Sequence, residues 1–256
     1  MIVINSSNEY NNAIDESKEK KEQLQDTNDE LREFNYTISH EIKAPVRAID
    51  GYARIFIEDY SKQVDKDGIL LIEGIRHICS DTLLLINKLL EYIKFAEVEP
   101  TKEVINLKEV VQSIFEELLF GYTEKNKIEL KFENELPIIL GDNILIKQVI
   151  TNLISNSLKF TANKELAIIT VGYSYKNNEN VFYIKDNGVG FDMKFSESLF
   201  GMFQRMHSEN DFEGSGVGLA IVKKIIQKFN GRAWITGEVG KGACTYFTIG
   251  EENILK

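Results

Sequence analysis

Positions that alternate steps of four and three carry mostly apolar residues along the first part of the chain. They hold Leu24, Asn28, Leu31, Asn35, Ile38, Ile42, Pro45, Ile49, Tyr52 and Phe56, and a second segment repeats the spacing with Ile72, Ile75, Cys79, Thr82, Ile86, Leu89 and Ile93. This spacing is typical of a coiled-coil seam or a four-helix bundle. One chain supplies two such helices, joined near residues 61–68, and two helices cannot enclose a core alone. The pattern predicts a homodimer whose two helical hairpins form a four-helix bundle.

The beginning of the first helix, roughly residues 13–30, is poor in apolar residues and rich in Lys, Glu and Asn. It can be a frayed or disordered tail, or a two-stranded signalling coil in which Asn28 and Asn35 set the register. The sequence leaves both interpretations open.

The pattern changes after Pro100, where short β-type runs alternate with amphipathic helical segments. The β-type runs span residues 127–132, 167–175, 181–185, 232–236 and 243–249, and the helical segments span about 107–121, 142–160 and 216–229. This order predicts an α/β sandwich with one sheet and one helical layer. We therefore expect an α+β protein with a coil or linker at 1–30, a helical hairpin at 31–99 and an α/β domain at 100–256.

The composition is that of a soluble globular protein, with 256 residues, 43% hydrophobic and 27% charged. The net charge of −10 argues against a nucleic-acid surface but not against ATP, which needs only a few local cations. Cys79 and Cys244 are expected to be buried thiols in a reducing cytoplasm. No signal peptide is evident, and charges interrupt the most apolar stretch, residues 69–93. The expected location is cytoplasmic, with no membrane segment.

His40 lies between seam positions 38 and 42, on the outward face of the predicted first helix. An exposed helical histidine is often only a surface residue. Here, however, Pro45 cannot donate to the carbonyl of Glu41 and should kink the helix beside His40. Glu41 could accept the imidazole Nδ1 proton and leave Nε2 as a nucleophile. Since adjacent helical residues do not share a face, this contact is a hypothesis that needs a favourable rotamer.

Asn152, Asn156 and Lys159 follow one another at i, i+4 and i+7, on one face of the predicted helix 142–160. Amide oxygens suit Mg²⁺ and an ammonium suits a phosphate. Standing alone, the same residues could be an ordinary solvated helix face.

Two glycine-rich segments accompany this helix. Residues 186–190 (Asp-Asn-Gly-Val-Gly) follow a predicted strand, and residues 214–219 (Gly-Ser-Gly-Val-Gly-Leu) open a predicted helix. Each can be a plain turn. Backbone N–H groups at a helix N-terminus can also hold phosphates. The second segment lacks the Lys-Ser/Thr ending of a P-loop.

In this order and spacing, the segments resemble those of the sensor histidine kinases over about residues 31–249. The phosphoacceptor box matches FNYTISHEIKAPVRAI (34–49) and the N box matches QVITNLISNSLKF (148–160). The G1, F and G2 boxes match KDNGVGFD (185–192), LFGMFQRMH (199–207) and GSGVGLAIVKKI (214–225). The F box and RAIDGYARIFIEDY (47–60) are closest to the phytochrome-like branch.

The resemblance implies an ATP-binding domain of the GHKL (Bergerat) class that uses ATP and Mg²⁺. His40 would take the γ-phosphoryl group, with Glu41 and Arg205 assisting, and pass it to an aspartate on the receiver domain of a separate response regulator. Mg²⁺ would be held by Asn156 with Asn152, and residues 207–215 would form a lid over the nucleotide. The nucleotide would be bound by Asn152, Asn156, Lys159, Phe160, Asp186, Gly188, Gly190, Gly214, Gly216, Gly218 and Leu219. An upstream sensor domain is expected to be missing from this chain.

Two departures from the family pattern have consequences. Ala44 stands where many relatives carry the Thr or Asn that positions water for dephosphorylating the regulator, so weak phosphatase activity is expected. Phe160 replaces a frequent Tyr, which keeps the ring but loses the hydroxyl.

Two alternative functions remain at this stage. The chain could be a dimeric, non-catalytic scaffold that signals by conformation. It could also be a plain ATPase, although Gln148, one turn before Asn152, is a poor general base.

Overall fold

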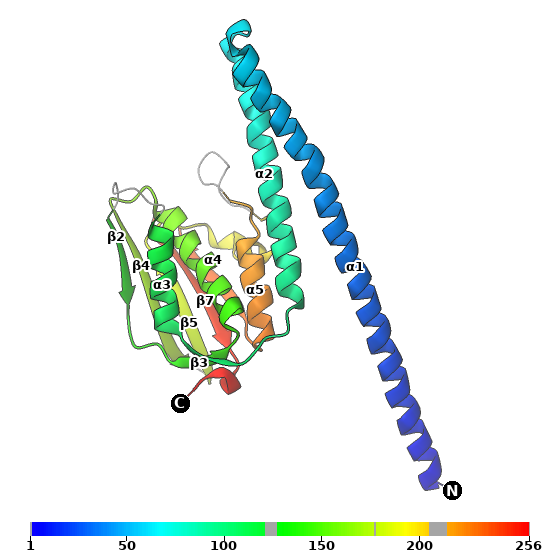
Figure 1. Cartoon of the computed structure of the whole chain (residues 1–256). Helices are drawn as coiled ribbons and strands as arrows, with labels where there is room; N and C mark the ends of the chain where they lie inside the picture. Colours follow the sequence, from blue (N-terminus) through cyan, green and yellow to red (C-terminus); the bar gives the residue numbers. More distant parts are fainter. Residues whose placement is uncertain (1, 121–126, 177, 205–213, 256) are drawn as a thin grey trace. The chain divides into compact units, whose positions relative to one another are not determined.

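The computed structural model describes residues 2–120, 127–176, 178–204 and 214–255 (Figure 1). The chain forms two compact units, Met1–Leu90 and Glu91–Lys256. Among the described residues, no helix is both long and apolar enough to cross a lipid bilayer.

The first unit is a helical hairpin, as the spacing predicted. Helix α1 (Ile2–Tyr60) runs without interruption through Pro45 and is followed by the 3₁₀ turn η1 (Ser61–Gln63). Helix α2 (Lys66–Glu97) begins where the Asp65 carboxylate accepts a hydrogen bond from the Gly68 N–H at 2.8 Å, which satisfies one of the amides that a helix start leaves unpaired.

The contact between α1 and α2 uses a different face of α1 from the predicted seam. The Arg76 guanidinium of α2 donates to the Asp50 carboxylate of α1 at 2.9 Å. The residues one turn further along each helix, Ala53 and Cys79, are both buried. In contrast, four apolar residues of the predicted α1 seam are between 37% and 74% exposed, namely Ile38, Ile42, Ile49 and Tyr52. On α1 the hairpin therefore closes beside these four residues and leaves them uncovered within one chain, whereas the predicted seam residue Cys79 of α2 is buried.

The second unit is a two-layer α/β sandwich, which confirms the predicted architecture. Its five-stranded sheet has the order β2 (Lys127–Phe132), β4 (Leu166–Lys176), β5 (Glu179–Asp186), β7 (Gly242–Ile249) and β6 (Ala233–Glu238). The β2–β4 pair is parallel and the others are antiparallel. Figure 1 shows one layer of helices over one face of the sheet, namely α3 (Leu107–Leu119), α4 (Asn143–Thr161) and α5 (Gly218–Lys228).

A second, smaller sheet was not predicted. Strands β1 (Glu103–Asn106) and β3 (Ile138–Gly141) pair antiparallel beside the main sheet. Three further 3₁₀ turns complete the described elements, η2 (Met193–Phe195), η3 (Ser198–Phe200) and η4 (Glu251–Asn253).

The core of the second unit lies between the helical layer and the sheet. It includes Phe182 and Phe247, whose rings stack at 5.2 Å, and the fully buried Ile154 of α4. The end of α2 contributes to this core through Phe95, which is 7% exposed. The Lys228 ammonium also donates to the carbonyl of Val98 at 2.8 Å. The packing thus groups the end of α2 with the sandwich, whereas the division at residues 30/31 and 99/100 remains a prediction from the sequence.

Candidate nucleotide-binding site

Helix α4 presents the predicted polar face. Asn152, Asn156 and Lys159 are partly exposed, while the residues expected on the core side, Ile146, Ile150 and Leu153, are at most 2% exposed. The helix begins at Asp142, whose side chain accepts hydrogen bonds from the N–H groups of Ile144 and Leu145. The Asp142 cap and the apolar stripe fix how α4 lies on the sheet, and that fixes which side chains face outward.

The start of α5 lies against the polar face of α4. The Asn152 amide Nδ2 donates to the Gln148 carbonyl at 3.0 Å, and the Asn152 Oδ1 is 3.0 Å from where a Cβ on Gly218 would lie. A Cβ on Gly214 would likewise lie 3.0 Å from the Lys159 ammonium nitrogen. The structure therefore brings the N-box and G2 segments together, and the N-terminus of α5 is adjacent to the Asn152 amide oxygen.

Gly214 and Gly216 adopt positive φ angles of 154° and 68°. At Gly216 a side chain would also lie within 2.9 Å of the Gln204 carbonyl oxygen. Glycine is therefore required for the shape of this loop, whatever it binds.

Asp186 ends strand β5, as predicted, and is 7% exposed. Its Oδ1 accepts hydrogen bonds from the N–H groups of Gly188 at 2.9 Å and Ala243 at 3.2 Å. Burial raises the pKa of the Asp186 carboxyl, and these bonds, the Ser157 hydroxyl and the Lys164 charge oppose the rise without cancelling it. The site thus contains a buried carboxylate with fixed orientation, able to accept a hydrogen bond from a ligand.

Gly188 and Gly190 were expected to let the backbone approach a ligand, but the structure gives them a packing reason. A Cβ on Gly188 would lie 2.5 Å from the Phe160 carbonyl oxygen, and one on Gly190, whose φ is 64°, would overlap the Glu238 carbonyl. The Val189 N–H donates to the Phe160 carbonyl at 3.2 Å. The G1 turn is therefore fitted tightly between the end of α4 and the β6–β7 turn.

The other predicted nucleotide residues are placed as follows. The Lys159 ammonium lies 4.2 Å from the centre of the Phe160 ring, a cation–π distance. Leu219 is partly buried and packs against the core of the unit. Arg205 and residues 207–213 of the predicted lid lie outside the described residues.

His40 and Glu41 are both exposed on α1, as the spacing predicted, and Ala44 is exposed one turn later. They belong to the first unit, whereas the α4–α5 site belongs to the second.

Two structural features beside this site were not predicted from the sequence. Ser157 is buried on the core side of α4, and its hydroxyl opposes the rise in the Asp186 pKa; its signal in the sequence is a polar side chain, like that of the buried Thr161, within an apolar stripe. The Gln148 amide donates to the Glu91 carboxylate at 2.6 Å, a contact that no sequence pattern indicates. A neutral amide such as that of Gln148 is a poor general base, which argues against the plain ATPase alternative.

The donor set fits a magnesium ion that is shared with a phosphate ligand. No cluster of three or more His, Cys, Asp or Glu side chains that could hold a metal occurs among the described residues. Mg²⁺ commonly takes one or two protein oxygens together with phosphate oxygens and water. The Asn152 and Asn156 amides on α4 could supply those protein oxygens, with Lys159 nearby on the same face for the phosphate.

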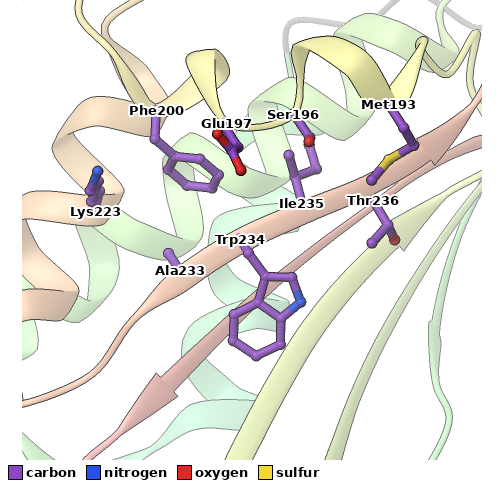
Figure 2. A pocket seen from close by; sticks show the side chains of 9 residues that line it. All are labelled: Met193, Ser196, Glu197, Phe200, Lys223, Ala233, Trp234, Ile235 and Thr236. Carbon is purple, nitrogen blue, oxygen red and sulfur yellow. The ribbon is translucent and has the colours of Figure 1, made fainter.

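A separate pocket of about 430 Å³ lies along strand β6. Figure 2 shows its lining residues, which are Met193, Ser196, Glu197, Phe200, Lys223, Ala233, Trp234, Ile235 and Thr236. None of these is a predicted nucleotide residue. Nearby on the sheet, burial raises the pKa of the Cys244 thiol to about 11, so this sulfur stays protonated and is not a nucleophile at neutral pH.

Comparison with known proteins agrees with this arrangement. Residues 141–253 match the family described as "Histidine kinase-, DNA gyrase B-, and HSP90-like ATPase". Cyanobacterial phytochrome B of Nostoc sp. is 33% identical over 233 residues, which cover 89% of this chain and 30% of that protein. The methanogenesis regulatory histidine kinase FilI of Methanothrix harundinacea is 31% identical over 93% of this chain and 26% of its own length. The chain thus spans less than a third of these relatives.

Among solved structures, full-length ShkA in complex with AMPPNP superposes with a TM-score of 0.61 and 24% identity, over 88% of this chain and 46% of that one. This similarity supports the fold assigned to the described residues.

Proposed function

Because this chain belongs to the histidine kinase family and carries its ATPase domain, we propose that it is the core of a two-component kinase that uses Mg-ATP to phosphorylate His40. The observation that carries the proposal is the meeting of the α4 amide face with the start of α5, beside the buried Asp186 carboxylate. One site thereby offers groups that can bind a metal ion, phosphate groups and the purine base of a nucleotide.

In this proposal the base end of ATP lies at Asp186 and the phosphate end along α4. The ionised Asp186 carboxylate accepts from the adenine amino group, and Lys159 contacts phosphate oxygens. Asn152 and Asn156 would hold Mg²⁺, and a bound ion would supply positive charge against the charge that develops on the phosphates. The N–H groups at the start of α5 also favour a negative ligand.

His40 is the proposed nucleophile. Its exposed position on α1 leaves the ring open to an incoming phosphate. The Nε2 lone pair attacks the γ-phosphorus in line, the new P–N bond forms as the bond to the β–γ bridging oxygen breaks, and ADP leaves. Glu41 is proposed to hold the Nδ1 proton and so to favour the nucleophilic tautomer.

A second copy of the chain is the proposed partner of the first unit. The α1 stripe of Ile38, Ile42, Ile49 and Tyr52 is exposed in one chain, and α2 exposes Leu71, Ile75 and Ile78 to at least 41%. Apolar stripes of this length on adjacent helices favour burial against another helix pair. We therefore propose a homodimer with a four-helix bundle.

The phosphoryl group is proposed to pass from His40 to an aspartate on a response regulator. Since Ala44 offers no side chain that could position a water molecule by hydrogen bonding, hydrolysis of the phospho-aspartate on the regulator, which releases inorganic phosphate, should be slow.

The test is to incubate the chain with γ-labelled ATP and Mg²⁺ and to examine the label in acid and base. Acid-labile, base-stable label that is absent from His40→Gln supports the proposal. His77→Gln is the matched control, because His77 is also an exposed helical histidine, hydrogen-bonded to Asp81 at 2.8 Å. The proposal is wrong if the wild-type dimer binds ATP but gains no label, and that result would support the non-catalytic scaffold. The proposal is also wrong if His40→Gln is labelled as strongly as the wild type.

A further inference from the structure

The main sheet of the second unit has two edge strands, and their sequences differ in character. Strand β2, at one edge, reads Lys-Ile-Glu-Leu-Lys-Phe, so half of its residues are charged. Strand β6, at the other edge, reads Ala-Trp-Ile-Thr-Gly-Glu, with neither Lys nor Pro and with one charge at its end. Charged side chains and Pro commonly prevent an edge strand from pairing with another chain. Charges protect β2 in this way, whereas most of β6 lacks such protection.

The backbone of β6 alternates between groups that pair with β7 and groups that point out of the sheet. The carbonyl of Arg232, the residue before β6, accepts a hydrogen bond from β7 at 2.9 Å. The Gly237 N–H instead donates to the Met193 sulfur at 3.2 Å, outside the sheet. By the same alternation, the N–H and C=O groups of Ala233 and Ile235 point outward. Within the part of the chain that the structure describes, these outward groups have no hydrogen-bond partner.

The pocket of about 430 Å³ lies along the same strand, between β6 and the segment that carries η2 and η3 (Figure 2). Its apolar lining includes Met193, Phe200 and Ile235. A strand that paired with the outward groups of β6 would direct every second side chain to this side of the sheet. The pocket therefore has the position and the volume to receive a large apolar side chain from an added strand.

Two opposite charges at this pocket have no partner within the chain. Glu197 and Lys223 are exposed lining residues, and neither side chain forms an ion pair or hydrogen bond among the described residues. By contrast, Glu238 at the end of β6 is paired with Lys241 at 2.6 Å. An occupant of the pocket can therefore bind more tightly if it carries one cation and one anion beside its apolar side chain.

We propose that β6 and its pocket bind an extended segment of a partner protein, which adds a strand to this edge of the sheet. The segment pairs with Ala233 and Ile235, places an apolar side chain in the pocket, and carries opposite charges for Glu197 and Lys223. A second copy of β6 fits less well, because it has no Lys or Arg for Glu197 and its one carboxylate is already paired with Lys241. Since none of the predicted nucleotide residues lines this surface, binding here does not require the proposed kinase reaction.

The test uses a synthetic peptide, acetyl-Thr-Lys-Thr-Leu-Thr-Glu-Thr-amide, whose Lys, Leu and Glu side chains share one face of a strand. The peptide is titrated into the full chain, and binding is followed by the fluorescence of the single tryptophan, Trp234, which lines the pocket. A second peptide carries N-methyl groups on Leu and on the Thr after it, so that one of them blocks pairing with β6 in either strand direction. Its Kd should be at least about 10-fold higher than that of the unmodified peptide.

Variants of the chain test the same contacts from the other side. Ala233→Pro removes an outward N–H but no bond to β7, which an edge strand tolerates, and should raise the Kd of the peptide at least about 5-fold. Ala233→Ser keeps the N–H and should change this Kd less than about 2-fold. Glu197→Gln should raise it about 2- to 5-fold, but should not change the Kd of a peptide with Thr in place of Lys.

The proposal is overturned if the wild-type chain does not bind the peptide, or if the N-methylated peptide binds equally well, because backbone pairing would then be absent. The comparison of the two peptides uses the unaltered protein, so it decides the matter even if Ala233→Pro does not fold. If the full chain without peptide assembles beyond a dimer in sedimentation, and folded Ala233→Pro does not, β6 pairs with a second copy and the proposed occupant is wrong.

Discussion

Asp142 is the N-cap residue of α4, and replacing it should destabilise the second unit more than replacing any other helix-capping residue that the structure describes. The Asp142 Oδ1 accepts from Ile144 N at 2.9 Å and Leu145 N at 3.0 Å, which caps α4. Its Oδ2 accepts from the N–H of Thr101 at 3.1 Å and from the Thr101 hydroxyl at 2.9 Å, which ties the segment before β1 to α4. One carboxylate therefore performs two separable tasks.

The two tasks have separate magnitudes. Loss of an N-cap removes about 1 kcal/mol, and loss of the bonds from Thr101 to a charged group removes about 2 kcal/mol. Asp142→Ala should thus lower the free energy of unfolding by about 3 kcal/mol. Asp142→Asn keeps an oxygen for the cap but points its NH₂ at the Thr101 N–H, so it should lose only about 2 kcal/mol. Thr101→Val, which removes only the hydroxyl bond, should lose about 1 kcal/mol.

The assay is urea unfolding of the full chain, followed by tryptophan fluorescence. The chain has a single tryptophan. This residue, Trp234, stacks on Tyr246 at 5.2 Å in the second unit, so its signal reports that unit alone. A loss below 1 kcal/mol for Asp142→Ala, or equal losses for Ala and Asn, would refute the reasoning.

The same carboxylate makes stability depend on pH. Burial raises the pKa of Asp142, but the N–H groups of Leu145, Thr101 and Ile144 and the Thr101 hydroxyl outweigh it and leave the pKa below its ordinary 3.8. A carboxyl group whose pKa is lower in the native than in the unfolded protein stabilises the fold. This stabilisation is fully present at pH values above the unfolded-state pKa and is lost as the pH falls through the native-state pKa. The advantage of the wild type over Asp142→Asn should therefore be constant near neutrality and shrink below pH 3.8.

Three further predictions concern other parts of the chain. Ala44→Thr should speed dephosphorylation of the phosphorylated regulator about 10-fold, whereas Ala48→Thr one turn later should not; equal rates for both variants would refute the role given to position 44. Ile49→Glu should raise the dimer Kd at least about 100-fold in sedimentation experiments, because it buries an unpaired charge; Arg47→Gln, with the same change in charge, should not. Gly190→Ala should lower the free energy of unfolding by about 2 kcal/mol or more. Gly240→Ala also has a positive φ, 80°, but has open space around it, and should lose about 1 kcal/mol; equal losses would mean that the Glu238 overlap is relieved.

Helix α4 shows what the sequence could predict. Its apolar stripe is long and regular, so both its length and its outward face followed from periodicity alone, and the structure places Asn152, Asn156 and Lys159 on that face. The five strands of the main sheet were also found within about two residues of their observed bounds, because each alternates apolar and polar residues between clear turns.

The parts that were missed depend on partners far away in the chain. Strands β1 and β3 have four residues each and pair across more than thirty positions, so neither carries a local signal. The packing reason for glycine at position 190 was not visible in the sequence, because the Glu238 carbonyl that a side chain there would overlap is almost fifty residues away.

The hairpin illustrates a different limit. Three-and-four spacing identifies an apolar face but does not say whether the partner is the other helix of the same chain or a second chain. Small and charged side chains such as Ala53 and Asp50 carry little weight in such a pattern, yet they make the contact between α1 and α2.

The burial of Phe95 in the second unit decides where the ATPase portion can be cut out for separate production. A fragment that starts at residue 100, where the apolar pattern changes, would lose the Phe95 ring from its core, the Glu91 partner of Gln148 and the Val98 carbonyl that Lys228 binds. Removing a buried phenylalanine typically costs about 3–5 kcal/mol, a large part of the stability of a domain this size. A fragment beginning at or before Glu91 keeps these contacts and is the one to express for crystallisation or ligand screening.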